Sequence, residues 1–287
     1  MPDIRLIAMD MDGTLLGRER GVIPPVNLQA LRSAQARGIH LCLASGRAPD
    51  DASFHAYDVG LSMHIIALNG GVILLEPLGP AVSSRHIPEA VARRVYGLIQ
   101  QAGLPFALFS DHDVALSRPS AYTGQLKEAW GTFMDREGGR TRVITAPDAV
   151  EPRLARVSKF VVTSITEPEL LLPLREQISA LCPKVEVTSS WIDNIEINPC
   201  GVNKGAALTA LAERLGIPMA QVMAIGDNDN DVSMLEAAGC GVAMGNATPA
   251  ALAAADYITL PCLDNGVAAA IRALALEESV SGVRPLR

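Results

Sequence analysis

The sequence predicts an α/β fold in which a parallel sheet covered by helices is interrupted by an inserted α+β module. Short, strongly apolar segments alternate with helical patterns in residues 1–80, and the same alternation returns after residue 195. Between these regions the alternation stops, and this stretch contains both tryptophans, a Gly138-Gly139 break and scattered prolines. Strands that are apolar throughout are buried on both faces, as in a parallel sheet between two layers of helices.

Residues 1–80 are expected to form three strands separated by two helices. Pro24-Pro25 begins the first helical pattern and Gly38 follows it, which fits the preferences of helix termini. In chain order the expected elements are a strand Ile4–Met9, a helix from Pro24 to about Gly38, a strand Ile39–Ser45, a helix from about Pro49 and a strand ending at Asn69-Gly70.

The inserted module and the returning α/β region complete the prediction. Strand-like pieces (PFALFS and KFVVTS) and two helical patterns (residues 88–103 and 167–181) fill the middle. The returning region should contain a helix Lys204–Leu215, a buried strand Val222–Gly226, further short strands and helices, and a frayed tail after Glu277. The predicted domains are a discontinuous α/β domain, residues 1–80 and 195–287, and an inserted α+β domain, residues 81–194.

Composition restricts the class of partner. The 287 residues are 49% hydrophobic and carry a formal net charge of −7 without a basic block, which argues against nucleic acid or an anionic membrane as the main partner. The five cysteines form no C-x-x-C pair, and no apolar run reaches the length of about 18 residues that a membrane helix needs. No signal peptide is evident, so a cytoplasmic protein that acts on a small molecule is expected, and its oligomeric state cannot be read from the sequence.

Acidic side chains follow two of the predicted strands. Asp10 and Asp12 come directly after the first strand, and residues i and i+2 of an extended chain point the same way. Three acids within Asp227–Asp231 follow the strand Val222–Gly226, and such a local charge calls for a cation. The EF-hand pattern fails there because Val232 stands where it needs Gly, so a hard cation such as Mg²⁺ fits better. The alternative is that both segments are ordinary polar turns.

Two more strand or helix ends carry groups suited to an anion. Ser45-Gly46-Arg47 follows the second strand, and a hydroxyl with free amides there makes an anion site, although a plain Ser turn and a surface Arg are alternatives. Lys204 lies at the start of a helix, where a cation opposes the helix dipole, so an anion at the same helix end is indicated, although a surface Lys is the alternative. Neither a phosphate-binding P-loop nor a G-x-S-x-G nucleophile motif is present, and the histidines lack H-x-x-x-H spacing.

Taken in order, these motifs resemble those of the haloacid dehalogenase-like hydrolases, in the Cof-type branch with a large cap domain inserted mid-chain. The four resembling segments are DMDGTLL (Asp10–Leu16), ASGR (Ala44–Arg47), GVNKG (Gly201–Gly205) and GDNDNDVSML (Gly226–Leu235), with LNGG and GVAMGNA also similar. The resemblance implies a Rossmann-like core, with residues 81–194 as a cap that sets substrate specificity.

The resemblance also implies a mechanism. Asp10 would attack a phosphate monoester to give an aspartyl-phosphate, and Asp12 would act as general acid and then general base. Mg²⁺ would be bound by Asp10, the backbone carbonyl of Asp12 and Asp227, with Asp231 one step removed from the metal.

The remaining residues that the resemblance assigns are expected to hold the phosphate or the substrate. Those expected at the phosphoryl oxygens are Met11 and Gly46 through their amides, Ser45, Lys204 and Asn230. Those considered for contacts to the substrate are Arg47, Asn69, Asp193 and Asn194, together with the cap residues Asp111, His112, Arg118 and Trp191.

The function expected from the sequence is therefore a Mg²⁺-dependent phosphatase of small phosphorylated metabolites, with sugar phosphates preferred as substrates. A phosphosugar mutase on the same scaffold is an alternative, which an assay for released phosphate would separate. A glycosyltransferase that binds a metal–nucleotide through Asp10 and Asp12 leaves Lys204 and the segment 226–231 unexplained. A pure binding protein is disfavoured because unused buried acids cost stability.

Overall fold

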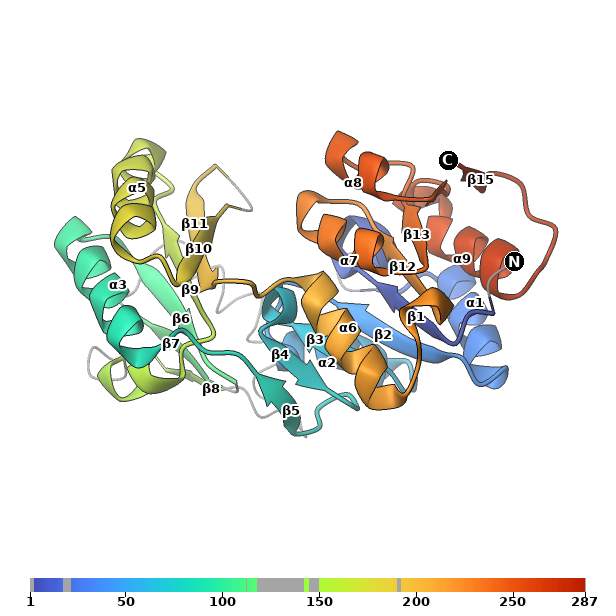
Figure 1. Ribbon diagram of the computed structural model, residues 1–287, viewed down its shortest axis with the longest axis horizontal. Helices are drawn as coiled ribbons and strands as arrows, with labels where there is room; N and C mark the ends of the chain where they lie inside the picture. Colours follow the sequence, from blue (N-terminus) through green and yellow to red (C-terminus); the bar gives the residue numbers. More distant parts are fainter. Residues whose placement is uncertain are drawn as a thin grey trace. The chain divides into compact units, whose positions relative to one another are not determined.

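The computed structural model describes residues 3–17, 22–111, 113–117, 142–144, 150–189 and 192–286 (Figure 1). The chain forms two compact units. The first comprises Met1–Arg47, Ala52–Pro80 and Asn203–Arg287, and the second comprises Ala48–Asp51 and Ala81–Val202. Within the described ranges, every helix is too short or too polar to cross a lipid bilayer.

The first unit is built on a twisted, mainly parallel sheet. Its strands lie in the order β15-β14-β13-β12-β1-β2-β3-β4, and all neighbours from β14 to β3 are parallel. β4 and β15 are antiparallel to β3 and β14, respectively. The strands are β1 (Leu6–Met9), β2 (His40–Ala44), β3 (His64–Ala67), β4 (Val72–Leu74), β12 (Val222–Gly226), β13 (Cys240–Ala243), β14 (Tyr257–Ile258) and β15 (Arg284–Pro285).

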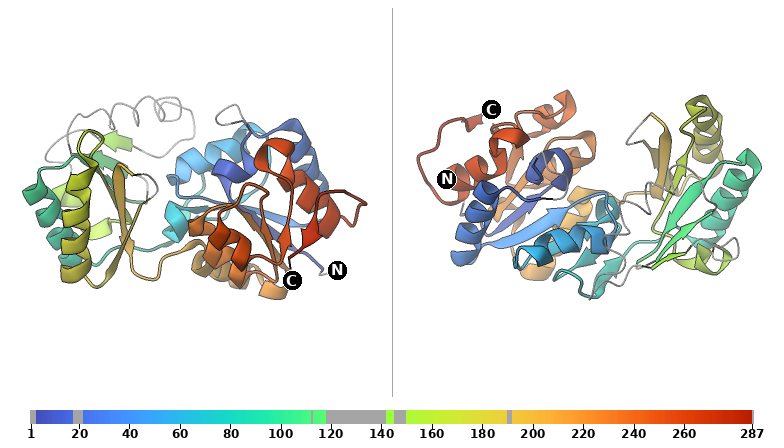
Figure 2. Two further views of the ribbon diagram at one scale, coloured as in Figure 1. Left: turned by 90° about the horizontal axis from the view of Figure 1, so that it is seen from above. Right: turned by 180° about the vertical axis from the view of Figure 1, so that it is seen from behind.

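Helices cover both faces of this sheet, as the apolar strands require. α6, α7 and α8 pack side by side, whereas α1 packs with α9 on the opposite face (Figures 1 and 2). All four residues of β1 are buried between these layers. The helices are α1 (Pro25–Ala36), α2 (Pro49–Asp58), α6 (Lys204–Leu215), α7 (Val232–Ala237), α8 (Pro249–Ala254) and α9 (Gly266–Ala270), which continues as a helical turn Ile271–Ala275.

The second unit is an α+β sandwich. Its sheet has the strand order β10-β11-β9-β6-β7-β8, with β7 and β8 parallel and the other neighbouring strands antiparallel. α3 and α5 cover one face, and their apolar side chains form a core with Phe106, Phe160 and Ile197 (Figure 1). The elements are β5 (Ala81–Ser84), α3 (Glu89–Ala102), β6 (Phe106–Phe109), β7 (Asp113–Leu116), β8 (Arg142–Ile144), β9 (Lys159–Thr163), α5 (Leu171–Leu181), β10 (Val185–Thr188) and β11 (Asn194–Pro199).

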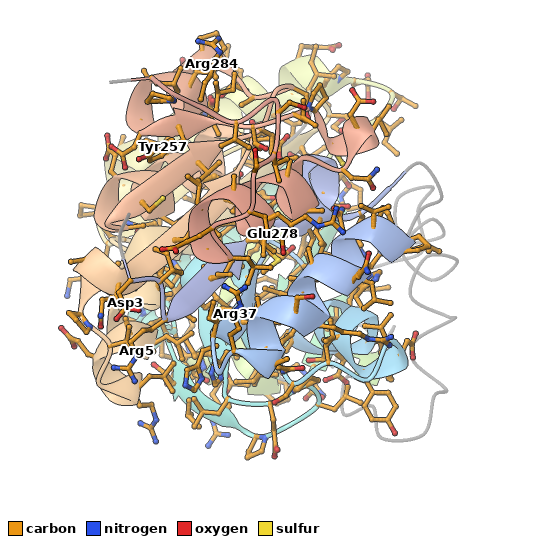
Figure 3. All side chains as sticks on the ribbon, turned by 90° about the vertical axis from the view of Figure 1, so that its right-hand side faces the viewer. Asp3, Arg5, Arg37, Tyr257, Glu278 and Arg284 are labelled. Atoms are coloured by element: carbon orange, nitrogen blue, oxygen red, sulfur yellow. The ribbon has the colours of Figure 1, made fainter. Side chains whose placement is uncertain are left out.

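The predicted fold class, a Rossmann-like α/β core with an inserted α+β unit, is confirmed, but two details differ. The second unit runs to Val202 instead of residue 194, because β11 pairs with β9 and β10 in the antiparallel sheet. The tail is also more ordered than expected. Arg284 pairs with Ile258, next to Tyr257, so β15 closes the edge of the core sheet (Figure 3).

Candidate active site

The polar residues predicted from the sequence gather at one edge of the core sheet. β1, β2, β3 and β12 are parallel neighbours, so their carboxyl ends meet at the same edge. Asp10 follows β1, Ser45 follows β2, Leu68-Asn69 follows β3 and Asp227 follows β12. Open α/β sheets bind ligands at this edge, and the sheet therefore brings these side chains to the position where a ligand is expected.

A buried lysine joins two of the acids. Lys204 Nζ donates to Asp10 Oδ1 at 2.5 Å and to Asp231 Oδ1 at 2.6 Å. Lys204 and Asp231 are fully buried, and Asp10 is 6% exposed. A cation at the first position of α6 opposes the helix dipole, and these two carboxylates offset that cost. The three side chains form a buried cluster of one lysine and two carboxyl groups.

Both carboxylate oxygens of Asp231 accept hydrogen bonds. Its Oδ2 accepts hydrogen bonds from the backbone amides of Asp227 and Asn228, at 2.9 and 3.0 Å, while its Oδ1 accepts from Lys204. The chain can fold back this closely because residue 226 is glycine, since a Cβ at Gly226 would clash with the Asp231 side chain. Asp231 thus fixes both Lys204 and the turn that carries Asp227.

The side chains of Thr14 and Asn246 contact the carboxylate of Asp227. Thr14 Oγ1 donates to Asp227 Oδ1 at 2.7 Å, and Asn246 Nδ2 lies 3.4 Å from Oδ2. Asn246 also donates to the Gly13 carbonyl at 3.0 Å and accepts from the Cys262 amide at 2.7 Å, so it ties the turn after β1 to the turn after β13. Gly13 has a φ of +85° and passes so close to Asp227 that any side chain there would clash.

These acids have the character of a cation site. Carboxylate oxygens of Asp10, Asp227 and Asp231 lie within 4.8 Å of one another. Burial raises the pKa of Asp10 to about 7, against the opposing effect of Lys204. Burial and the charge of Asp231 raise the pKa of Asp227 to about 6, although the Thr14 hydrogen bond opposes the shift. Protonation or a bound cation would relieve the repulsion, and an all-oxygen donor set suits Mg²⁺.

Asp12 differs from Asp10 in its exposure, in its side-chain partner and in the direction of its pKa shift. Its side chain is 61% exposed, and its carboxylate forms two parallel hydrogen bonds with Arg47, from Nε to Oδ2 at 2.8 Å and from Nη2 to Oδ1 at 2.7 Å. Partial burial favours the neutral carboxyl, but the hydrogen bonds and charge of Arg47 outweigh it and hold the pKa of Asp12 below its ordinary value. Arg47, predicted as a possible substrate contact, is here an ion-pair partner of Asp12.

The residues expected around a phosphate lie on adjoining turns. Asn230 Nδ2 donates to Asn69 Oδ1 at 3.2 Å, and the Asn69 amide donates to the Ser45 carbonyl at 2.9 Å. Gly46 lies against Asn69, since a Cβ at Gly46 would be 3.0 Å from Asn69 Oδ1. Met11 is buried in the helical turn Met11–Leu15 that follows Asp10.

The predicted residues Asp111, Asp193 and Asn194 of the inserted unit make contacts of their own within the second unit. Asp193 and Asn194 belong to the second unit, where Asn194 begins β11 and its carbonyl accepts from Ser189 Oγ at 2.8 Å. Asp111 Oδ1 and His86 Nε2 are hydrogen-bonded at 2.8 Å. His112, Arg118 and Trp191 lie outside the described residues.

Three residues of the site were not singled out from the sequence. Thr14 and Asn246 both hold Asp227, and His55 contacts Arg47. Asn246 follows the parallel strand β13. Because side chains after the carboxyl ends of parallel strands meet at the ligand-binding edge of the sheet, its position in the sequence could have identified it. His55 lies within α2, and only the three-dimensional fold places it beside the turn after β2.

The chain is similar in sequence to known hydrolases. The family of haloacid dehalogenase-like hydrolases matches residues 7–271. The chain is 31% identical over 271 residues to 5-amino-6-(5-phospho-D-ribitylamino)uracil phosphatase YcsE of Bacillus subtilis, covering 94% of this chain and 95% of that protein. It is 29% identical over 257 residues to pyridoxal phosphate phosphatase YbhA of Escherichia coli, covering 88% and 92%.

The fold of this chain is also similar to that of a solved hydrolase structure. A haloacid dehalogenase-like hydrolase from Bacteroides thetaiotaomicron superposes with a TM-score of 0.81 at 28% identity, covering 94% of this chain and 99% of that one. Because the curated relatives are phosphatases, the predicted enzyme class, a phosphoric monoester hydrolase, is confirmed. The chain belongs to the haloacid dehalogenase-like hydrolases.

Proposed function

We propose that the protein is a Mg²⁺-dependent phosphatase of small phosphorylated metabolites, and that it works through an aspartyl-phosphate on Asp10. The observation that carries this proposal is the division of labour between two acids on one turn. Asp10 is buried and held by Lys204, whereas Asp12 is exposed and held by Arg47. This difference supports Asp10 as the acid that attacks and Asp12 as the acid that transfers the proton.

Asp10 is suited to be the nucleophile. Lys204 holds its Oδ1, and no donor among the described residues contacts Oδ2. This oxygen would attack phosphorus in line, forming the P–O bond to Asp10 while the P–O bond to the leaving group breaks. A carboxylate is repelled by a phosphate dianion, and the charge of Lys204 offsets part of that repulsion.

Asp12 is suited to carry the proton. In the first step it would give its proton to the leaving oxygen, so that the product departs as an alcohol. In the second step it would take a proton from the water that attacks phosphorus, which frees Asp10 and yields inorganic phosphate. Its exposure allows it to meet both the leaving group and water.

The donor set supports a Mg²⁺ ion held by Asp10, Asp227 and the backbone carbonyl of Asp12. Because both oxygens of Asp231 already accept hydrogen bonds, we assign Asp231 to orient Lys204 and the Asp227 turn. When bound, Mg²⁺ would supply positive charge that lowers the repulsion between Asp10 and the phosphate. We assign the hydroxyl of Ser45, the amides of Met11 and Gly46, Lys204 and Asn230 to the phosphoryl oxygens.

For the substrate, we propose a small phosphorylated metabolite, with a sugar phosphate preferred. The two curated relatives named above act on a phosphorylated ribitylamino-uracil and on pyridoxal phosphate, which supports a small organic phosphate. We assign specificity to the inserted unit, predicted as residues 81–194, with Asp193 and Asn194 as candidate contacts. Arg47 and Asn69 are the corresponding candidates on the core.

Phosphate release from p-nitrophenyl phosphate tests the proposal. We expect release with Mg²⁺, none with excess EDTA, and none from Asp10→Asn. Asp3→Asn is the matched control, because Asp3 is exposed and pairs with Gln221 at the start of β1. Wild-type rates from Asp10→Asn would remove Asp10 as nucleophile. Turnover of a sugar monophosphate without phosphate release would instead indicate a mutase.

A further inference from the structure

Asp12 depends on one side chain for its orientation. Among the described residues, Arg47 is the side chain that hydrogen-bonds to the Asp12 carboxylate, with donor–acceptor distances of 2.8 and 2.7 Å. The two bonds run from one guanidinium edge to both carboxylate oxygens. This fork fixes the plane and the direction of the carboxylate, which a single hydrogen bond would leave free to rotate.

The backbone alone does not fix Asp12. Its side chain is 61% exposed, and the next residue, Gly13, has a φ of +85° in a turn without regular pairing. An exposed aspartate on such a turn samples several side-chain rotamers. Proton transfer in a reaction needs the acid within hydrogen-bond reach of the leaving oxygen, so each wrong rotamer is unproductive.

Arg47 is itself held in place by contacts of its side chain and its backbone. His55 Nε2 lies 3.2 Å from Arg47 Nη1, and because a guanidinium only donates, His55 accepts this hydrogen bond through its Nε2 lone pair. The Arg47 amide donates to Ser45 Oγ at 3.2 Å, and the Arg47 carbonyl accepts from the Leu68 amide at 3.0 Å. His55 is 4% exposed, so the contact with Arg47 lies in the protein interior on the His55 side.

We propose that Arg47 is a positioning residue for proton transfer by Asp12, and that His55 sets the orientation of its guanidinium. This inference rests on the proposed role of Asp12 as acid and base. In the first step the Asp12 O–H bond breaks and an O–H bond forms on the leaving oxygen as its bond to phosphorus breaks. Arg47 exchanges no proton. When Asp12 is protonated, one of the two hydrogen bonds from Arg47 is released, and the other, on the unprotonated oxygen, keeps the carboxyl pointed at the leaving oxygen.

The inference predicts a selective defect. An aryl oxide leaves readily without a proton, whereas an alkyl oxide needs one, so proton transfer matters most for alkyl esters. The parameter kcat/KM reports the steps up to departure of the leaving group and excludes hydrolysis of the intermediate. A misdirected Asp12 should therefore steepen the fall of kcat/KM with rising pKa of the leaving group. A general loss of structure would lower kcat/KM for all esters alike.

The experiment measures kcat/KM of the full-length protein with Mg²⁺ for a series of aryl and alkyl phosphates that carry uncharged leaving groups. We expect Arg47→Lys, which keeps the charge but loses the fork, and Arg47→Ala to lose about 10–100-fold on alkyl phosphates and less than about 5-fold on aryl phosphates, a part of the 10²–10⁴-fold that acid–base catalysis contributes. Asp12→Asn, which lacks the acid altogether, gives the steepest fall of kcat/KM with leaving-group pKa that loss of proton transfer can cause. Arg32→Ala, which removes an exposed Arg that contacts the Val59 carbonyl, is the matched control.

His55 provides a second, independent pair of variants. His55→Gln keeps an acceptor for Arg47 and should retain the wild-type dependence of kcat/KM on leaving-group pKa. His55→Leu removes the acceptor and should show the steeper dependence expected for Arg47→Lys. Thermal unfolding of each variant checks that the fold is intact.

Two results would overturn the inference while leaving the phosphatase proposal in place. One is an equal loss for aryl and alkyl esters in the Arg47 variants while Asp12→Asn remains selective. The other is a loss confined to additional substrates with anionic leaving groups, which would make Arg47 a substrate contact. Absence of phosphate release by the wild-type protein, or a non-selective Asp12→Asn, would instead refute the proposed function and the inference with it.

Discussion

Lys204→Met probes the buried charge cluster most severely. Methionine keeps most of the length of the side chain but removes the ammonium group that lies 2.5 Å from Asp10 and 2.6 Å from Asp231. Two buried carboxylates then face each other without their cation. Removing one partner of a buried ion pair costs about 3–5 kcal/mol, which corresponds to about 6–20 °C in the midpoint of thermal unfolding for a unit of this size.

The stability lost in Lys204→Met should increase as the pH rises. Burial already raises the pKa of Asp10 to about 7 in the presence of Lys204, and loss of Lys204 raises it further. A carboxyl group whose pKa is higher in the folded state stabilises the fold while it is protonated, and this contribution is lost as pH rises through the folded-state pKa. The penalty of Lys204→Met should therefore be larger at about pH 8 than at about pH 6.

The assay is thermal unfolding followed by circular dichroism, in EDTA, with Lys184→Met as the control at an exposed lysine. The double variant Lys204→Met/Asp231→Asn should regain part of the lost stability, because it removes one of the two unpaired charges. The reasoning is refuted if Lys204→Met unfolds at the wild-type temperature at both pH values, or if its penalty shrinks as pH rises.

Further predictions concern the cation site. Asp227→Ala should weaken Mg²⁺ binding in a calorimetric titration and abolish most Mg²⁺-dependent activity, and an unchanged titration curve would exclude Asp227 as a ligand. Because pKa values of about 7 for Asp10 and about 6 for Asp227 mean that protons compete with the cation at acidic pH, Mg²⁺ affinity should be about 100-fold weaker at about pH 5.5 than at about pH 7.5. A pH-independent affinity, or binding without proton release when buffers of different ionisation enthalpy are compared, would contradict this competition.

The core of the site could be predicted from the sequence because it follows from strand direction. Once Ile4–Met9 and Val222–Gly226 are identified as parallel strands, Asp10 and Asp227 must meet at one edge of the sheet, and they do. Side-chain geometry could not be predicted in this way. The i, i+2 spacing predicts that Asp10 and Asp12 point the same way, but their partners cannot be predicted from it. The contact between Arg47 and Asp12 depends on how the turns after β1 and β2 face each other.

The boundary of the inserted unit shows a second limit of prediction from the sequence. Residues 195–199 alternate between apolar and polar side chains, with Ile195 and Ile197 facing the helices of the second unit and Glu196 on the other face. This pattern identifies a strand but carries no information on which sheet the strand joins. Only its pairing with β9 and β10 assigns it to the second unit.

The central claim is that Asp10 carries the phosphoryl group, and chemical trapping tests it most directly. Asp12→Asn is mixed with p-nitrophenyl phosphate and Mg²⁺, quenched in acid and reduced with borohydride, which converts an acyl phosphate of aspartate to homoserine. We expect about one equivalent of p-nitrophenol per enzyme, since the variant lacks the base that the second step needs, with homoserine found by mass spectrometry at residue 10. Repeated turnover with residue 10 unmodified, or homoserine at Asp227 or Asp231, would contradict the account.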